Sequence, residues 1–271
     1  MKVCALVNRW LEKKAHLTPR ALEDLYRMAR RWRAAVGAKE VSELGPEDVE
    51  AVERASAAGR SASYVNKERM YFRGWLRYAA ELGLVSESVG RVWKRRQEVV
   101  KKEYVCLSRE EEERLLAHCP CWLASIVEFA VATGLREGTL KLLTWGMVGE
   151  EGTLRVPPEI MKARKAHRIP LSGKAYAALG PRRGPTEALF PDLPEARVVY
   201  RCFKKAVKAA CINPNTNVHD LRRTFVGRLL QAGCPTATVA QLGGWAGESV
   251  MIRHYLAEME SVEALTYLEK V

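Results

Sequence analysis

The sequence contains 271 residues, which is enough for one large domain or two modest ones. Hydrophobic residues make up 48% of the chain, so a buried core is expected, and the composition excludes a disordered or low-complexity protein. Lys and Arg outnumber Asp and Glu by 44 to 32, which gives a formal net charge of +12. This excess favours a polyanionic partner such as nucleic acid, although a basic solvated surface also occurs in other classes of protein.

Seven cysteines are spread along the chain without a regular framework, which is typical of reduced thiols in a cytoplasmic protein. The segment 118–121 (His-Cys-Pro-Cys) lacks the second pair of ligands that a structural zinc site requires. No apolar stretch approaches the ~20 residues that span a bilayer, and Asn8 and Arg9 interrupt the start before a signal-peptide core could form. We therefore expect a cytoplasmic protein without metal, cofactor or membrane partner.

Apolar residues at helical spacing run through the first hundred residues. Thr18-Pro19 combines a capping hydroxyl with proline at the first helical position, and the helix that it begins is expected to end at Gly37. Further helices are expected to begin at Gly45-Pro46, at about Ser61 and after Ser86. The third of these four helices carries an apolar stripe formed by Tyr64, Tyr71, Trp75, Tyr78 and Leu82.

The basic excess is concentrated in this helical part, since residues 1–105 hold 22 Lys and Arg against 14 Asp and Glu. Its two basic clusters, within 30–33 and 94–102, resemble ordinary solvated faces, but on a small helical domain they also suit a surface that follows phosphates. The charged, weakly patterned stretch that comes next predicts an interdomain linker. The expected domains are therefore 1–97 (helical), 98–107 (linker) and 108–271 (C-terminal).

The C-terminal domain is predicted to be mixed α+β. Residues 108–111 (Ser-Arg-Glu-Glu) match a capping box and begin a helix. Strand-like patterns at 153–157 and 167–171 flank a basic turn, which predicts a small antiparallel hairpin or three-stranded sheet. Further helices are expected at about 173–180, 195–210, 219–232, 235–242, 248–257 and 261–269. The expected fold class is mainly α, with a helical N-terminal domain and a mixed α+β domain that contains a small antiparallel sheet.

Four short motifs in the C-terminal domain carry side chains suited to phosphate chemistry. Transesterification at an anionic phosphodiester requires fixed cations, a nucleophile that can form a covalent ester, and a proton donor for the leaving hydroxyl. In chain order the motifs are Thr133-Gly134-Leu135-Arg136, His219-Asp220-Leu221-Arg222, Leu242-Gly243-Gly244-Trp245 and Arg253-His254-Tyr255. A single His-x-x-Arg is a low-information pattern. The ordered set, within about 108–260, resembles the tyrosine recombinase (phage integrase) family.

The resemblance implies a role for each matching cation. Arg136 and Arg222 match the two catalytic arginines, which clamp the scissile phosphate; a guanidinium suits this task because it donates parallel hydrogen bonds to two phosphate oxygens. Lys162, in the basic hairpin turn, matches the lysine that protonates the leaving 5′ oxygen. Lys165 lies three residues further along the same turn and is the alternative acid.

The remaining matches concern the nucleophile and its neighbours. His219 matches the first histidine, which manages the proton of the nucleophile, and Tyr255 matches the nucleophile itself. Trp245 stands where the family has His or Trp; its indole N–H can donate to a phosphate oxygen, although a Trp considered alone is more often a core residue. His254 is a neighbour rather than a partner, because successive helical positions point about 100° apart. Tyr267 follows the motif and is interpreted as part of a packing helix.

Two positions depart from the family pattern. Three residues after the first arginine the family often has an acidic residue, whereas this chain has Thr139. Glu137 is adjacent to Arg136 but is expected to face elsewhere, so the support of Arg136 is not predicted. One residue more than usual separates Trp245 from Tyr255, which predicts a local loop adjustment before the helix that carries the tyrosine.

The resemblance implies a site-specific DNA recombinase of the phage integrase or Xer-like type, whose SAM-like N-terminal domain and catalytic domain close around double-stranded DNA. It implies DNA integration or recombination through a covalent 3′-phosphotyrosine intermediate without metal or ATP, by a homotetramer on two duplexes. Little chain precedes Thr18, so we expect a Xer-like or Cre-like organisation without a separate arm-binding domain. The alternatives are a type IB-like topoisomerase and a catalytically silent DNA-binding accessory protein.

The segment beyond Tyr255 carries a further apolar stripe. Val262, Leu265 and Leu268 recur at helical spacing, which indicates that one face of this segment is buried. Docking on a neighbouring subunit and docking on the chain's own domain both satisfy this pattern. The target DNA sequence does not follow from the chain, because base readout depends on a few side chains that reach the groove edges.

Overall fold

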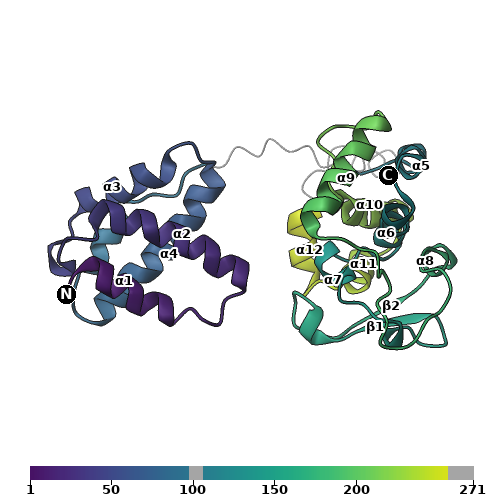
Figure 1. The fold of residues 1–271 in the computed structure, drawn as a ribbon, viewed down its shortest axis with the longest axis horizontal. Coiled ribbons are helices and arrows are strands. Elements are labelled where there is room, and N and C mark those ends of the chain that lie inside the picture. Colours follow the sequence, from purple (N-terminus) through teal and green to yellow (C-terminus); the bar gives the residue numbers. More distant parts are fainter. Residues whose placement is uncertain (98–105, 256–271) are drawn as a thin grey trace, which may run out of the picture. The chain divides into compact units, whose positions relative to one another are not determined.

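The computed structural model describes residues 1–97 and 106–255 and divides the chain into two compact units, Met1–Lys101 and Lys102–Val271 (Figure 1). Each unit has its own buried hydrophobic core. The predicted fold class is confirmed, because the described residues are mainly helical and form one small antiparallel sheet in the second unit. The helix predicted at 261–269, with its apolar stripe and Tyr267, lies outside the described residues.

Helices form the N-terminal unit within residues 1–97. They are α1 (Val3–Glu12), α2 (Pro19–Val36), α3 (Pro46–Ala57) and α4 (Ala62–Glu81), with the 3-10 turns η1 (Val41–Glu43) and η2 (Glu87–Arg91). Helix α2 begins as predicted: Thr18 Oγ1 accepts a hydrogen bond from Ala21 N at 3.4 Å, and Pro19 is the first helical residue. The chain after Gly37 then turns through η1 into α3.

Aromatic rings fill the core of this unit. Trp32 of α2 packs against Phe72 and Trp75 of α4, with ring centroids 5.1 Å and 6.5 Å apart. Trp93, which follows η2, packs against Phe72 at 5.5 Å. The predicted stripe on α4 is therefore displaced toward Phe72, and Leu82, which the pattern placed on the stripe, is 40% exposed because α4 has already ended at Glu81.

The helix expected after Ser86 is the short 3-10 helix η2 rather than an α-helix. Ser86 caps it, and Ser86 Oγ accepts a hydrogen bond from Ser88 N. Gly90 lies so close to α4 that a side chain there would meet Leu76 Cδ1 at 2.9 Å. Trp93, which follows η2, is fully buried in the core.

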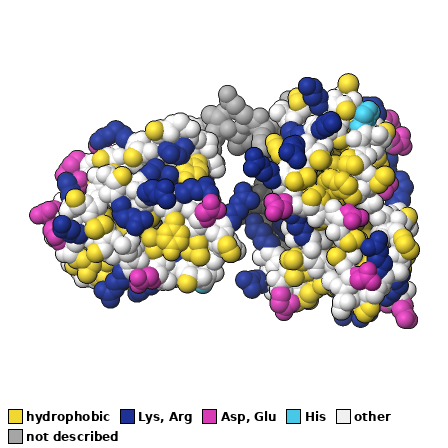
Figure 2. Space-filling view, in the orientation of Figure 1, with side chains coloured by type: hydrophobic (Ala, Val, Ile, Leu, Met, Phe, Trp, Pro, Cys, Tyr) yellow, Lys and Arg dark blue, Asp and Glu magenta, His cyan; other side chains and the backbone are white. Residues whose placement is uncertain are grey.

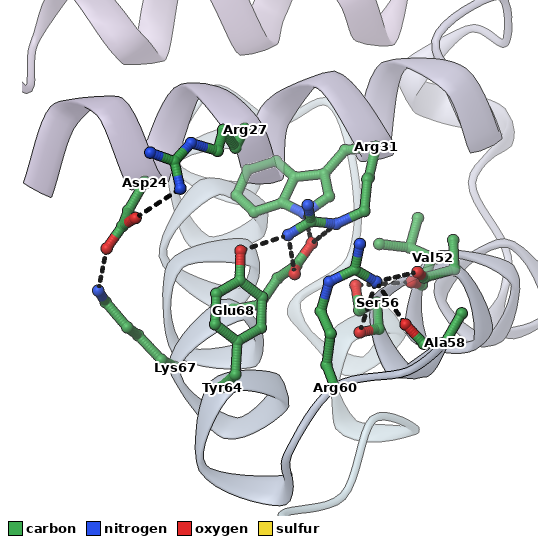
Figure 3. Close-up of polar contacts among 12 residues, drawn as sticks. Asp24, Arg27, Arg31, Val52, Ser56, Ala58, Arg60, Tyr64, Lys67 and Glu68 are labelled. Atoms are coloured by element: carbon green, nitrogen blue, oxygen red, sulfur yellow. Dashed lines mark hydrogen bonds and ion pairs between the residues drawn. The ribbon is translucent and has the colours of Figure 1, made fainter.

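A buried carboxylate joins α4 to α2 (Figure 3). Glu68 is fully buried and accepts hydrogen bonds from Trp32 Nε1 at 2.9 Å and from Arg31 Nη2 at 2.5 Å. Arg31 Nη2 also donates to Tyr64 Oη at 2.8 Å. Figure 3 shows the Arg60 side chain beside Tyr64, where its Nη1 donates to carbonyl oxygens at the end of α3. A buried charge requires such partners because desolvation of an unpaired carboxylate costs several kcal/mol.

The C-terminal unit surrounds one nearly all-apolar helix. Its elements are α5 (Arg109–Ala117), α6 (Cys121–Thr133), α7 (Glu137–Leu140), η3 (Trp145–Met147), β1 (Thr153–Val156), η4 (Pro158–Ile160), β2 (His167–Pro170), α8 (Gly173–Ala178), α9 (Ala196–Ala209), α10 (Val218–Gln231), α11 (Thr236–Leu242) and α12 (Glu248–Tyr255). Helix α6 packs against α8, α9 and α10, as its apolar sequence on all faces requires (Figure 1). The capping box predicted for α5 is present, with Ser108 N donating to Glu111 Oε2 at 2.9 Å.

Strands β1 and β2 form the predicted hairpin. They pair antiparallel, with Val156 opposite His167 and Thr153 opposite Pro170. Val148 adds an isolated bridge to Leu154, so two strands and one bridge replace the three-stranded alternative. The loop between the strands contains η4 and the basic turn on which Lys162 and Lys165 lie.

The beginning of the described C-terminal chain is held against α10. Leu107 is buried, and its backbone N–H donates to Thr224 Oγ1 at 3.0 Å. Arg228 Nη2 donates to the carbonyl oxygens of Leu107 and Ser108 at 3.3 Å, and Arg228 pairs with Glu112 of α5. Residues 107 and 108 therefore bond to the same helix that carries His219 and Arg222.

Candidate active site

The site is organised by the first turn of α10. Asn217 caps this helix, and its backbone N–H donates to Asp220 Oδ2 at 2.7 Å. Asp220 is 1% exposed and also pairs with Arg223. The acidic residue inside the His-x-x-Arg motif is therefore used to form the helix start, where a carboxylate also interacts favourably with the helix dipole. This cap sets the direction in which His219 and Arg222 leave α10.

The Arg222 side chain is buried. Its exposed fraction is 2%, and Nη1 donates to the carbonyl oxygen of Gly134 at 2.5 Å. The guanidinium also lies 3.6 Å from the centroid of the Trp245 ring. Thr224 and Phe225 beside it on α10 are buried as well. The burial of this charged group is tolerated because a carbonyl oxygen and an aromatic face stabilise the guanidinium.

Gly134 positions both arginines. It ends α6 in the left-handed conformation, with φ of 65°, and a side chain there would overlap the ring of Phe225. The turn directs the carbonyl of Gly134 to Arg222 and brings Arg136 to the N-cap of α7. Arg136 is partly buried at this position.

The acidic neighbour of Arg136 faces elsewhere. Burial raises the pKa of the Glu137 carboxyl, and Lys141 is the charge that lowers it. Glu137 Oε1 is buried without a hydrogen-bond partner among the described residues. Thr139, which occupies the position where the family often has an acid, is 5% exposed and packs in the core. The structure therefore assigns neither residue to Arg136.

Two glycines shape the turn that carries Trp245. Gly243 follows α11, and a side chain on it would overlap the indole of Trp245. Gly244 adopts φ of 66°, and a side chain there would meet Met161 Cε at 2.8 Å and the ring of His167 at 3.1 Å. The Gly-Gly-Trp sequence thus folds the indole back against its own backbone and onto Arg222. Stacking on the Arg222 guanidinium is thus a contact of Trp245 that the structure shows.

His219 lies near all the arginines of the site. Burial lowers the pKa of its imidazole, and Arg223, Arg222 and Arg136 lower it further by charge repulsion, against the opposing effect of Asp220. The ring remains partly accessible to solvent. At neutral pH the imidazole is therefore neutral and able to accept a proton. The structure thus gathers Arg136, His219, Arg222 and Trp245 from three separate motifs.

The two candidate lysines lie on the exposed part of the hairpin loop. Lys162 follows Met161, which is 3% exposed, whereas Lys165 follows Arg164, which has a left-handed backbone with φ of 52°. Both lysine side chains are exposed. Among the described residues, no hydrogen bond or ion pair joins either lysine to the arginines.

Tyr255 is the last residue of α12, which begins at Glu248 after the short loop predicted behind Trp245. Thr236 at the start of α11 donates a hydrogen bond to Glu248 Oε1 and ties the two helices together. The side chains of 253–255, and with them the predicted nucleophile and His254, lie outside the described residues. Their roles therefore stay predictions.

The sequence reasoning missed one histidine of this region. His167 begins β2, is 7% exposed, and its Nε2 lies 3.0 Å from the carbonyl oxygen of Leu242 at the end of α11. Its position in the strand-like pattern at 167–171 indicates only that the side chain faces inward, and no motif in the sequence marks it as part of the site. Burial, and then the charge of Arg222, lower the pKa of this imidazole, while its hydrogen bond to Leu242 raises it.

The described residues contain no group of three or more His, Cys, Asp or Glu side chains able to hold a metal ion. In the His-Cys-Pro-Cys segment, 118–121, His118 Nδ1 forms a hydrogen bond with the carbonyl oxygen of Arg114. Burial raises the pKa of the Cys119 thiol to about 11. Within the described part of the chain, no helix has the length and apolar character needed to cross a membrane.

Comparison with known proteins shows the family. The sequence profile of the Phage integrase family matches residues 106–261, which is more than half of the chain. The chain therefore belongs to the Phage integrase family. It is similar to the integrase of Salmonella phage P22, with 30% identity over 167 residues, 55% of this chain and 42% of that protein. The match thus spans less than half the length of that relative.

Solved structures share the fold. A variant of the Tn1549 transposon integrase, in complex with a circular intermediate DNA, superposes with a TM-score of 0.79 and 17% identity over 100% of both chains. A lambda integrase tetramer bound to a Holliday junction gives a TM-score of 0.74 and 18% identity, covering 91% of this chain and 75% of that chain. At these identities the likeness establishes the fold of the chain.

Proposed function

We propose that this chain is a site-specific DNA recombinase that breaks and rejoins strands through a covalent 3′-phosphotyrosine intermediate. The observation that carries the proposal is the convergence of Arg136, His219 and Arg222, with Trp245 stacked on Arg222. Membership of the Phage integrase family supports the reaction class. A site of this composition suits an anionic substrate that gains negative charge in the transition state.

In this proposal the arginines bind the scissile phosphate. The Nη1 of Arg222 donates to the carbonyl oxygen of Gly134, which fixes the orientation of the planar guanidinium, a group suited to bind phosphate oxygens. Arg136, at the N-cap of α7, approaches from a second element. Because the Arg222 guanidinium is held by the carbonyl of Gly134 and the ring of Trp245, little reorganisation of this cation is needed when charge develops on the nonbridging oxygens.

Tyr255 is the proposed nucleophile and His219 its proton acceptor. The phenol must lose a proton with an ordinary pKa near 10 as its oxygen bonds to phosphorus and the 5′ oxygen leaves. The lowered pKa of His219 keeps its imidazole neutral and so able to take that proton. A 5′-hydroxyl of the partner strand later attacks the phosphotyrosine and returns the phosphodiester. The ester bond is exchanged rather than hydrolysed, so the reaction needs no ATP.

Lys162 is the proposed acid that protonates the leaving 5′ oxygen, with Lys165 as the alternative. Lys162 directly follows the buried Met161, which contacts Gly244 beside Trp245, whereas no buried residue adjoins Lys165 before His167 two positions later. An anchored neighbour restricts the path of Lys162 more than that of Lys165. This difference supports the choice made from the sequence.

Double-stranded DNA is the proposed partner, in the cytoplasm. The formal charge of +12 suits a phosphate backbone, and Figure 2 shows Lys and Arg side chains gathered on the visible face of the N-terminal unit. We assign DNA binding to the helical domain 1–97, joined by the linker 98–107 to the catalytic domain 108–271. The two domains close around the duplex, and four copies act on two duplexes. The lambda integrase has been seen as such a tetramer on a Holliday junction.

Strand exchange distinguishes this function from its alternatives. A linear fragment and a supercoiled plasmid, each carrying the DNA that flanks the gene, are incubated with the protein in EDTA without ATP. A recombinase joins the two molecules at one sequence. A type IB-like topoisomerase relaxes any supercoiled plasmid and joins none, and a silent accessory protein binds without either product. Either of these last two results contradicts the proposal.

A further inference from the structure

The feature that the proposed function leaves unexplained is the buried His167. Its Nε2 lies 3.0 Å from the carbonyl oxygen of Leu242, and a carbonyl only accepts, so Nε2 carries a proton and donates. Leu242 is the last residue of α11 and precedes the Gly-Gly-Trp turn. This hydrogen bond therefore joins the exit strand of the hairpin to the segment that carries Trp245.

The same turn rests on the hairpin by packing. At Gly244, a side chain would meet His167 Cδ2 and Nε2 at 3.1 Å and Met161 Cε at 2.8 Å, so the bare glycine lies directly on both residues. Met161 and His167 stand at the two ends of the basic turn, and both are buried. The turn that contains Lys162 is thus held at both ends against Gly244.

The contacts form a continuous path from the hairpin to the phosphate site. The His167 ring supports Leu242 and Gly244, the next residue is Trp245, and the Trp245 ring lies on Arg222 at 3.6 Å. The His167 Nε2 donor serves the only polar link between hairpin and turn among the described side-chain hydrogen bonds. An apolar side chain of similar size would preserve the packing but lose that link.

We propose that His167 is a positioning residue for the leaving-group acid: its hydrogen bond to Leu242 holds the Lys162 turn in register with Trp245 and Arg222. The proposal rests on the proposed function, because it concerns how Lys162 meets the 5′ oxygen of a phosphate bound by Arg222. His167 itself touches neither the phosphate nor the tyrosine. It acts through the position of another side chain.

The test uses two DNA substrates of one sequence that differ in a single atom. In one, the scissile phosphate is bonded to the ordinary 5′ oxygen; in the other, sulfur replaces that oxygen. A thiol has a pKa near 8.5, so a thiolate leaves without a proton, whereas an alkoxide needs an acid. A defect in the acid or in its position therefore lowers cleavage of the oxygen substrate and spares the sulfur substrate.

The variants separate the hydrogen bond from the packing. His167→Leu removes the hydrogen-bond donor. His167→Gln places an amide N–H near the position of Nε2, whereas the shorter side chain of His167→Asn carries an amide N–H that does not reach Leu242. His118→Gln, at the exposed end of α5, is the matched control. On the oxygen substrate, we expect His167→Leu and His167→Asn to form the covalent adduct about ten-fold more slowly than wild type, or slower still, because general acid catalysis contributes at least this much to the rate. On the sulfur substrate, we expect both variants to react within about three-fold of the wild-type rate.

Lys162→Ala should show the same pattern, and His167→Gln should recover most of the rate. If His167→Leu fails to fold, the comparison of Gln with Asn carries the test. Equal losses on both substrates, or no loss on either, overturn the positioning role while leaving the proposed function intact. A wild-type protein that forms no adduct on either substrate overturns the proposed function and this inference with it.

Discussion

At the scale of single residues, the site depends on glycines, which have no side chain, as well as on its arginines. Arg222 lies between the carbonyl of Gly134 and the ring of Trp245. Gly134 and Gly243 are the positions where a methyl group would enter an aromatic ring of the site. The geometry of the proposed phosphate site is thus set by glycine backbone as well as by charged side chains.

Gly243→Ala should therefore displace the indole from Arg222. We expect covalent cleavage of DNA to slow by about ten-fold or more, since misplacement of a catalytic group by about 1 Å can cost about a hundred-fold. Gly247→Ala is the matched control in the same loop, because a side chain there meets nothing within 4 Å. The rates are compared in single-turnover reactions. Equal rates for the two variants contradict the account of Trp245.

The charge state of His219 predicts a pH dependence. Its folded pKa is lowered by burial and by Arg223, Arg222 and Arg136, so the imidazole stays neutral below its ordinary value of 6.5. As pH falls, an acceptor of this kind loses activity only when its lowered folded pKa is reached. The rate of adduct formation should therefore remain unchanged from pH 7.5 through 6.5 and fall at more acidic pH. A midpoint above 6.5 contradicts a neutral, cation-flanked His219.

At the scale of elements, α10 links the catalytic motif to the start of the domain. Thr224 Oγ1 donates to the carbonyl of Asp220 at 2.9 Å and accepts from Leu107 N at 3.0 Å. The same hydroxyl thus joins Leu107 to the first turn of α10, which carries Arg222.

Thr224→Val keeps the shape of this side chain and removes its hydroxyl. The buried N–H of Leu107 then lacks an acceptor, which should lower the free energy of unfolding of the C-terminal unit by about 1–3 kcal/mol. Ser125→Ala is the control, because Ser125 Oγ makes only an exposed bond, to Cys121 O at 3.3 Å. Urea unfolding measures both. A loss no larger than that of the control contradicts the role of Thr224.

At the scale of the whole molecule, the two units have separate hydrophobic cores. The N-terminal unit contains the buried Glu68, bound by Arg31 and Trp32, and the C-terminal unit contains the arginine site. Separate cores predict separate unfolding. A change in one core should then leave the other unit folded.

Glu68→Leu tests this separation. It leaves the guanidinium of Arg31 and the indole N–H of Trp32 without their acceptor, which should destabilise the N-terminal unit by about 3–5 kcal/mol. The C-terminal unit should unfold at an unchanged urea concentration. Glu23→Leu, which removes an exposed pair with Arg27, is the control and should cost at most about 1 kcal/mol. A simultaneous shift of both transitions contradicts independent cores.

Local signals in the sequence predicted much of this fold. The caps at Thr18 and Ser108 and the antiparallel hairpin are consequences of neighbouring residues, so they could be predicted. The contact of His167 with Leu242 joins residues 75 positions apart, and the contact of the buried Arg222 with Gly134 joins residues 88 positions apart. Such contacts depend on how elements pack, which periodicity does not encode. The approach of Gly90 in η2 to α4 is likewise a tertiary contact, which the sequence pattern after Ser86 did not predict.

The central claim is that Tyr255 forms the covalent bond to DNA. The direct measurement is trapping of the protein on a nicked duplex whose cleaved strand end diffuses away, followed by mass spectrometry of the peptide that retains the nucleotide. The account predicts the nucleotide on Tyr255, loss of trapping in Tyr255→Phe with DNA binding retained, and normal trapping in Tyr267→Phe. Persistent trapping of Tyr255→Phe, or a nucleotide on any other residue, contradicts it.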